Sequence, residues 1–402
     1  MNPEDIKARR YWTLLFTAVY TASYITRINY GAVILEMARD TGWTNGVLSA
    51  ALTGSFVTYG IGQLVSGRLG DRFQPGRLVF AGLAVSGLMN ILIPLCPSAA
   101  AMTAVWCVNG FFQSFLWPPI VRLMVNIFPA EEYSRVTILV CLGSPVGTML
   151  TYLLSPVWIG LWGWRSVFFI SALCGEAMAL LWLFRGPKIA PAPPKTGGER
   201  GKDACISPML AVIMLAITVQ GVLRDGVSTW MPTYISESYD LGSRVSILTG
   251  VVMPLFAMLC YRAAGTVNRH FPGNPLVSAG IFFGVSTASA VVLDLLAGQQ
   301  VLGSVLCFAL LTGCMHGANL MLIGMIPAFY RKTGHVSFIS GLLNACTYVG
   351  SALSTYGIAR LAETAGWGFT VKTWVFLALA GGLLCICSIP AWRRRFTGRE
   401  NK

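Results

Sequence analysis

Two arginines lie in stretches of the sequence that are otherwise apolar enough to cross a membrane. Arg27 stands in segment 20–30 and Arg224 in segment 222–230. A charged side chain near the centre of a bilayer costs about 2.5 to 3.5 kcal/mol on insertion scales, so it normally faces a bundle interior or a water-filled cavity. A guanidinium keeps its charge and presents a rigid fork of N–H donors that suits phosphate or carboxylate. The pair therefore predicts a site in which two arginines bind one small anion.

Other polar and aromatic side chains fall on helical faces that would complete this site. Tyr20 and Tyr24 share a helical face with Arg27, and Gln220 shares one with Arg224. A later apolar segment carries Gln113 and Trp117 before a Pro-Pro pair that breaks its hydrogen-bond ladder. The predicted substrate-binding residues are Arg27, Arg224, Tyr20, Tyr24, Gln113, Trp117, Gln220, Asn344 and Tyr348. Packing and hydrogen bonding between helices is the alternative role for the uncharged members.

An acidic residue close to either arginine could neutralise its charge. None stands one helical turn from Arg27 or Arg224. Asp225 follows Arg224 directly, but in a regular α-helix with 3.6 residues per turn its side chain points about 100° away. We therefore expect that Asp225 does not neutralise Arg224. If transport is coupled to protons, the candidate proton carriers are Asp225, Glu176 and His316.

The composition fixes the class of protein that holds these residues. Hydrophobic residues make up 55% of the 402 and charged residues 11%, whereas soluble domains carry roughly 25% charged residues. A membrane span needs about 20 apolar residues. Twelve such runs lie near residues 11–35, 46–66, 77–95, 101–127, 134–158, 166–185, 208–232, 244–264, 275–296, 301–327, 336–360 and 369–391. An all-α membrane protein with twelve transmembrane helices is therefore expected.

Basic residues are distributed unevenly between alternate loops. One set of loops and ends holds 22 lysines and arginines and the opposite set holds 5. Because cytoplasmic loops carry the excess of basic residues, both termini are expected in the cytoplasm, with the protein in the cytoplasmic membrane. The net charge of +13 thus reflects orientation in a bilayer rather than nucleic-acid binding.

Signs of metal, nucleotide or enzyme chemistry are missing from the sequence. The 11 cysteines show no metal-ligand spacing, and no phosphate-binding G-x-x-x-x-G-K-[ST] loop occurs. No nucleophile and base stand in a recognisable arrangement. We expect no cofactor, no metal and no enzymatic activity, and a monomer that takes its energy from a gradient.

The loop between the second and third apolar runs has a recognisable pattern. Segment 66–77 reads SGRLGDRFQPGR. It resembles the Gly-x-Leu-x-Asp-Arg-x-Gly-Arg loop of the major facilitator superfamily, although Gln74-Pro75 shifts the last Gly and Arg. In that family the Asp and Arg latch helices together on the cytoplasmic side. The resemblance implies gating roles for Asp71, Arg72 and Arg68; a plain basic anchor at the membrane surface is the alternative.

The second half of the sequence repeats the first. Arg27 matches Arg224 and Arg72 matches Arg269, both 197 positions later, with Asn268 in place of Asp71. Pro129-Ala130 and Gly163-Trp164 recur at 327–328 and 366–367. Ordered matches at a nearly constant offset indicate two homologous halves. We predict a six-helix bundle at 1–185, a Pro/Gly-rich cytoplasmic linker at 186–207, and a second six-helix bundle at 208–402, as two pseudo-symmetric halves with the site between them near the midplane.

Within the superfamily, the whole chain resembles the organophosphate:inorganic phosphate antiporters, the family of the bacterial glycerol-3-phosphate and hexose-phosphate transporters. The similarity is carried by segments 24–29, 59–63, 113–119 and 223–234. It implies that Arg27 and Arg224 bind the phosphoryl group and that Trp117 lines the pathway. Gln63 and Ser144 stand where the glycerol-3-phosphate transporter has a lysine and a histidine, which leaves the substrate and the exchange for phosphate open.

The residues and the resemblance together leave three functions open. The first is a secondary carrier of a phosphorylated or other anionic metabolite that works by alternating access, with exchange for inorganic phosphate as the resemblance implies. The second is a sugar-phosphate sensor of the same fold that does not transport. The third is a proton-coupled carboxylate symporter that uses Asp225, Glu176 or His316.

Overall fold

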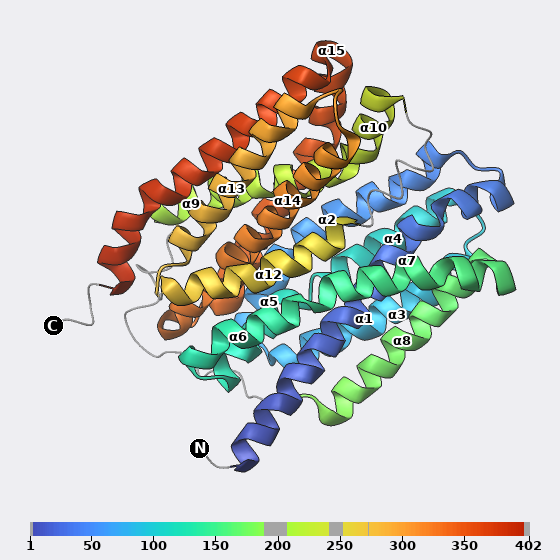
Figure 1. Cartoon of the computed structure of the whole chain (residues 1–402). Helices are drawn as coiled ribbons and strands as arrows, with labels where there is room; N and C mark the ends of the chain where they lie inside the picture. Colours follow the sequence, from blue (N-terminus) through green and yellow to red (C-terminus); the bar gives the residue numbers. More distant parts are fainter. Residues whose placement is uncertain (1–2, 189–206, 241–251, 272, 398–402) are drawn as a thin grey trace. The chain divides into compact units, whose positions relative to one another are not determined.

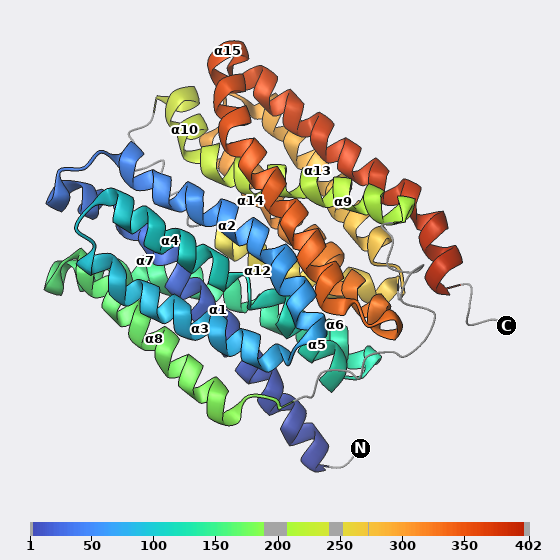
Figure 2. The same cartoon turned by 180° about the vertical axis from the view of Figure 1, so that it is seen from behind.

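The structure, a computed structural model, describes residues 3–188, 207–240, 252–271 and 273–397, and within these ranges it is helical without strands. Figures 1 and 2 show the helices from two opposite sides. Contact clustering divides the chain into two compact units, Met1–Gly197 with Tyr330–Ala345, and Gly198–Phe329 with Cys346–Lys402. Most of the predicted linker lies outside the described residues, so the domain boundaries stay a prediction.

The first unit contains eight α-helices and a short 3₁₀ turn. They are α1 (Pro3–Thr41), α2 (Asn45–Arg72), α3 (Pro75–Leu92), η1 (Ile93–Leu95), α4 (Ala99–Gln113), α5 (Trp117–Ile127), α6 (Ala130–Cys141), α7 (Gly143–Trp162) and α8 (Trp164–Arg185). Helix α1 packs against α7 and α8, α2 packs against α4, and α3 packs against α8 and α4. The side chains of Thr44 and Ser98 accept the free N–H groups at the starts of α2 and α4.

The second unit is also built from packed helices. Its described elements are α9 (Pro208–Gly221), η2 (Val222–Gly226), α10 (Val227–Tyr239), α12 (Val252–His270), α13 (Pro275–Leu296), α14 (Val301–Asn319), η3 (Leu320–Met325), η4 (Ile326–Thr333), α15 (Val336–Trp392) and η5 (Arg393–Thr397). Helix α14 packs against both α12 and α13. Helix α15, whose first turns belong to the other unit, bends at Gly366, where φ is 77°.

Ten helices in the described part of the chain are long and apolar enough to cross a membrane. They account for ten of the twelve predicted runs, with α15 contributing two of the spans, Val336–Ser354 and Arg360–Phe396. The other two runs, 11–35 and 244–264, correspond to α1 and to α12 with residues just before it that are not described. Helix α1 carries Arg27 and further charged residues towards both ends, which lowers its mean hydropathy.

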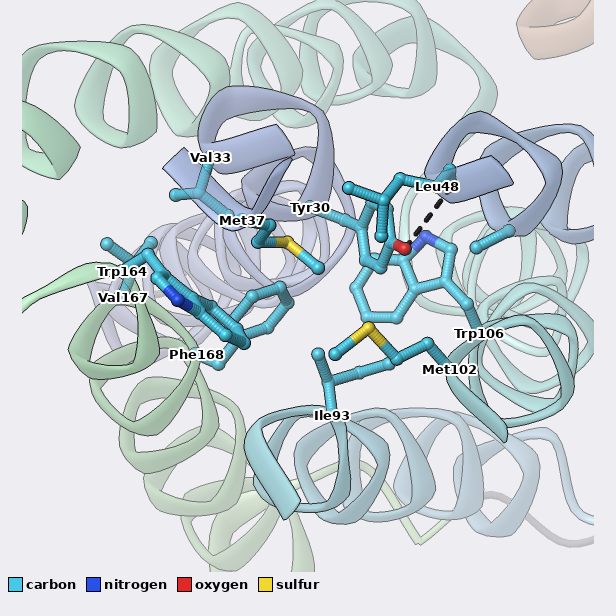
Figure 3. Packing of buried hydrophobic residues seen from close by; sticks show 11 residues of the cluster. Tyr30, Val33, Met37, Leu48, Ile93, Met102, Trp106, Trp164, Val167 and Phe168 are labelled. Carbon is cyan, nitrogen blue, oxygen red and sulfur yellow. Dashed lines mark hydrogen bonds between the residues drawn. The ribbon is translucent and has the colours of Figure 1, made fainter. Parts of the chain in front are cut away.

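A compact aromatic cluster holds α1 against its neighbours on the C-terminal side of Arg27 (Figure 3). The Tyr30 ring lies 5.0 Å from the Trp106 ring of α4 and 6.0 Å from the Phe168 ring of α8. Its hydroxyl donates to the Leu48 carbonyl on α2. Edge-to-face and tilted aromatic pairs contribute about 0.5 to 1.5 kcal/mol each beyond their buried area. This packing fixes the position of α1 three residues beyond Arg27.

Candidate anion-binding site

Arg27 lies among aromatic rings within the first unit. Its guanidinium carbon is 4.1 Å from the centre of the Tyr59 ring, 5.8 Å from that of Tyr24 and 5.9 Å from that of Phe56. Tyr59 and Phe56 come from α2, so two helices hold this side chain. A guanidinium stacked on a ring face has its plane fixed. That orientation is what two-pronged recognition of an anion requires.

Three of the predicted site residues form a chain of ring contacts that begins at this arginine with Tyr24. The Tyr20 ring lies 5.3 Å from the Tyr24 ring and 4.9 Å from the Trp117 ring. Trp117 is 4% exposed, and its indole N–H has no hydrogen-bond partner among the described residues. It begins α5 after the break at residues 114–116, which interrupts the helix as the Pro-Pro pair predicts.

Gln113 belongs to a buried network of side-chain hydrogen bonds. Its amide donates to the Thr26 hydroxyl at 2.8 Å, and Asn90 and Asn109 donate to the Thr26 carbonyl. Asn29 donates to Asn90 at 2.6 Å. These amides are buried and tie α1 to α3 and α4 directly beside Arg27. The network supports the arginine-bearing turn, and substrate contact by Gln113 itself stays a prediction.

Arg224 forms a two-pronged ion pair with Asp225, contrary to the expectation from the sequence. Its Nε and Nη2 atoms lie 2.6 and 2.7 Å from the two carboxylate oxygens. The expectation was wrong because it assumed a regular α-helix, whereas Val222–Gly226 forms a π-helical turn. A π turn spreads consecutive side chains differently from an α turn and is frequent at functional sites. Arg224 therefore sits with a built-in counter-ion.

Further polar groups surround this ion pair in the second unit. The Ser351 hydroxyl donates to Asp225, and the Ser228 hydroxyl donates to the Arg224 carbonyl. His316 lies within electrostatic range of both charged residues, and its Nδ1 is 3.2 Å from the Tyr261 hydroxyl. Two proton-carrier candidates, Asp225 and His316, are thus brought close to Arg224.

Three further predicted site residues are largely buried, Gln220 and Tyr348 in the second unit and Asn344 in the first. The Gln220 amide donates to the Met315 carbonyl at 2.9 Å and accepts from Asn319 at 3.3 Å, so it links α9 to α14. Asn344 and Tyr348 on α15 are 7% and 9% exposed. Substrate contact by these three residues stays a prediction.

Glu176 belongs to the first unit. It is on α8, with its carboxylate close to the backbone of Gly87 on α3. It has no hydrogen bond or ion pair to any residue that the structure describes. A proton-carrying role for Glu176 remains a prediction without a connection to the arginine sites.

The predicted latch joins α2 to the start of α15. The Asp71 carboxylate accepts the backbone N–H groups of Ser337 and Phe338 at 2.9 and 2.8 Å. These are the second and third residues of α15, so Asp71 caps the positive end of that helix. Arg68 lies over the Phe338 ring at 5.6 Å, whereas Arg72 is exposed.

One residue of this region was missed by the sequence analysis. Arg122 was counted among the basic loop residues, yet it is 5% exposed and donates to the Gly70 carbonyl beside Asp71. It also interacts electrostatically with Asp71. The available signal was its place inside an apolar run, three residues after the Pro-Pro pair.

The profile of the Major Facilitator Superfamily matches residues 16–355. The chain belongs to the Major Facilitator Superfamily. This membership confirms the predicted class of fold, and the protein is an all-α, multi-pass membrane protein. Among the described residues, no group of three or more His, Cys, Asp or Glu side chains is placed to hold a metal ion.

Relatives in this superfamily include both a sensor and a transporter. The chain is 26% identical to the membrane sensor protein UhpC of Salmonella typhimurium, over 97% of this chain and 94% of that one. It is 21% identical to a "Probable hexose phosphate transport protein" of Chlamydia muridarum, over 97% and 93%. The solved structure of the Major Facilitator Superfamily transporter FucP in the outward conformation matches with a TM-score of 0.71 and 10% identity, over 95% of this chain and 97% of that one. That similarity shows the fold alone.

Proposed function

We propose that this protein is a secondary carrier that moves a phosphorylated organic anion across the cytoplasmic membrane by alternating access. One observation carries the proposal: two arginines occupy equivalent positions of the internal repeat, and each is held in a defined orientation inside its unit. Rings of Tyr59 and Tyr24 hold Arg27, and Asp225 holds Arg224. A guanidinium fork suits a phosphoryl group, and two forks suit a dianion.

The Arg224–Asp225 pair adds a step to this mechanism. The side chains of Arg224 and Asp225 are 13% and 35% exposed, so the pair is shielded but reachable. An incoming phosphoryl group competes with the Asp225 carboxylate for the same N–H groups. Asp225 keeps its hydrogen bond from Ser351 when it releases the arginine. The counter-ion thus lowers the cost of the empty site and is displaced by the substrate.

The relatives support a phosphorylated substrate. One is named for hexose phosphate transport, and the chain and that protein match over nearly their full lengths. The relatives and matched structures are transporters and sensors rather than enzymes. We propose exchange for inorganic phosphate, with a single chain as the working unit and both termini in the cytoplasm, in line with the uneven distribution of basic residues.

A sensor function is the second candidate because the relative with 26% identity is named a membrane sensor protein. A sensor of this fold would use the same arginines to bind its ligand. A carboxylate symporter is the third candidate, and the proximity of Asp225 and His316 to Arg224 favours it. Ligand binding separates the third candidate from the first two, because a carboxylate symporter would bind carboxylates rather than phosphorylated compounds. Transport separates the first candidate from the second, because a sensor binds its ligand without moving it across the membrane.

A thermal-unfolding screen tests the binding chemistry. Purified protein is mixed with glycerol 3-phosphate, glucose 6-phosphate, inorganic phosphate, or carboxylates of similar size. A ligand present at 100 times its Kd stabilises the native state by about 2.7 kcal/mol, so we expect a higher unfolding temperature with phosphorylated compounds. The double variant Arg27→Lys/Arg224→Lys is the control and should not respond. A response to carboxylates alone would overturn the proposal.

A further inference from the structure

Each arginine-bearing helical segment ends in an acidic residue that accepts an indole N–H from later in the same unit. Asp40 stands 13 residues after Arg27, and Glu237 stands 13 residues after Arg224. Asp40 accepts from Trp164, and Glu237 accepts from Trp367. We call these two contacts the acid–indole clasps.

The first clasp closes the C-terminal end of α1 onto the start of α8. The Trp164 Nε1 atom is 2.9 Å from Asp40 Oδ2, and the Arg165 Nη1 atom is 2.7 Å from the same oxygen. These two donors lower the pKa of Asp40 below its usual range, so the acceptor is ionised at neutral pH. The Trp164 ring is 4% exposed and joins the aromatic cluster that also holds Tyr30 (Figure 3).

The second clasp closes the C-terminal end of α10 onto the second half of α15. The Trp367 Nε1 atom is 2.7 Å from Glu237 Oε2. Its ring lies 5.4 Å from that of Tyr234, which packs on Phe308 of α14 at 5.0 Å. As in the first unit, an aromatic cluster lies under the charged hydrogen bond.

The backbone that presents each indole is also the same in both units. Gly163 and Gly366 directly precede the two tryptophans, and both have φ of 77°, with ψ of 171° and 169°. This is a conformation that side-chain-bearing residues rarely adopt. Each glycine therefore turns the chain so that the next residue starts a new helical segment with its indole facing the acid.

The two halves have diverged elsewhere in ways that make this match informative. The latch carboxylate Asp71 corresponds to Asn268 in the second half. In contrast, the arginine, the acid 13 residues later, the glycine with positive φ and the tryptophan occur in both halves. The Trp367–Glu237 bond is exposed, and exposed charged contacts contribute little to stability, so general stability is a weak explanation for keeping it in the second half.

We propose that the acid–indole clasps position Arg27 and Arg224 for anion binding by fixing the ends of the helices that carry them. Each clasp joins the arginine-bearing helical segment to a segment that starts with the tryptophan. Each arginine therefore keeps its position along the helix axis and its orientation about that axis, relative to its own unit, as the protein changes conformation. This inference rests on the proposed function, since it gives the positioned residues an anion to bind.

A double-mutant cycle in the second unit tests the proposal, because that clasp is a single bond. Trp367→Phe keeps a ring but removes the N–H donor, and Glu237→Ala removes the acceptor. Each variant should weaken binding of glycerol 3-phosphate or glucose 6-phosphate, whichever the parent binds, by about 3- to 10-fold. The double variant should be no weaker than either single variant, because both changes remove one bond. Glu237→Asp should restore part of the affinity.

Trp374→Phe is the matched control. This tryptophan lies in the same helix with its ring 6.5 Å from the Trp367 ring, is 1% exposed, and its indole N–H has no partner among the described residues, so Trp374→Phe changes the same aromatic cluster without removing a hydrogen bond. It should leave the Kd unchanged. Additive losses in the cycle, or an equal loss from Trp374→Phe, would overturn the positioning role while leaving the proposed function standing. If the parent binds no phosphorylated compound, the proposed function fails, and the same cycle measured on the unfolding temperature still decides whether the clasp exists.

Discussion

Replacing Arg27 or Arg224 by lysine is expected to lower uptake of a phosphorylated substrate by about 10- to 100-fold. Lysine keeps the charge but loses the planar fork, so one of two charge-assisted hydrogen bonds is lost. Such a bond contributes about 1.5 to 3 kcal/mol, and each 1.4 kcal/mol is tenfold in affinity. Arg27→Lys also loses the stacked geometry on Tyr59. Uptake of labelled substrate into proteoliposomes measures the effect.

The Asp225→Asn variant is the control for this prediction. It leaves Arg224 in place and replaces the carboxylate that competes with the substrate by a neutral amide. Equilibrium binding of the phosphorylated ligand should therefore tighten, opposite in sign to Arg224→Lys. All three variants should appear in the membrane at parental levels. Full uptake by both lysine variants would contradict two-pronged binding by the arginines, and weaker binding by Asp225→Asn would contradict the displacement of Asp225 by substrate.

Asp71→Asn is expected to slow transport by tenfold or more with little change in ligand affinity. The carboxylate accepts two backbone N–H groups at the start of α15, and an amide offers one neutral oxygen in its place. Tyr59, which holds Arg27, stands 12 residues earlier on α2, about 18 Å along the helix at 1.5 Å per residue. The change therefore acts on the conformational cycle rather than on binding.

Uptake and equilibrium binding must both be measured on Asp71→Asn to separate these effects. Arg77→Gln, an exposed change in the first turn of α3, is the control and should affect neither. Arg122→Met, which removes the donor to the Gly70 carbonyl, should resemble Asp71→Asn. If binding weakens as much as transport, Asp71 belongs to the binding site or to its folding, and the latch function is wrong.

The architecture was readable from the sequence because its signals are long and repeated. An apolar run of near-spanning length predicts a membrane helix without any knowledge of the helices that pack against it. The constant offset between matching residues such as Arg27 and Arg224 indicates two halves. Asp71 was readable for a different reason, since a short glycine-containing motif surrounds it.

The local chemistry around the arginines was only partly readable. The helical wheel correctly placed Tyr24 beside Arg27 and Tyr20 beside Tyr24, because that part of α1 is a regular helix. The same helical-wheel argument was wrong at Asp225, because a π turn changes the angular spacing of consecutive side chains. The five residues of that turn show no sequence pattern that predicts it. Arg122 was missed because burial next to a distant carbonyl depends on how helices pack. The clasps likewise pair residues 124 and 130 positions apart.

Counterflow in proteoliposomes tests the central claim most directly. Arg27 and Arg224 keep their charge at every accessible pH, and in the proposed mechanism a bound anion offsets charge that is costly inside a membrane. The loaded form should therefore change orientation more readily than the empty form. Vesicles preloaded with inorganic phosphate or with the organic phosphate should take up labelled organic phosphate faster than empty vesicles, with no pH gradient and no membrane potential. Binding without any counterflow would identify a sensor, and fast uptake into anion-free vesicles that depends on a pH gradient would contradict exchange and direct attention to Asp225 and His316.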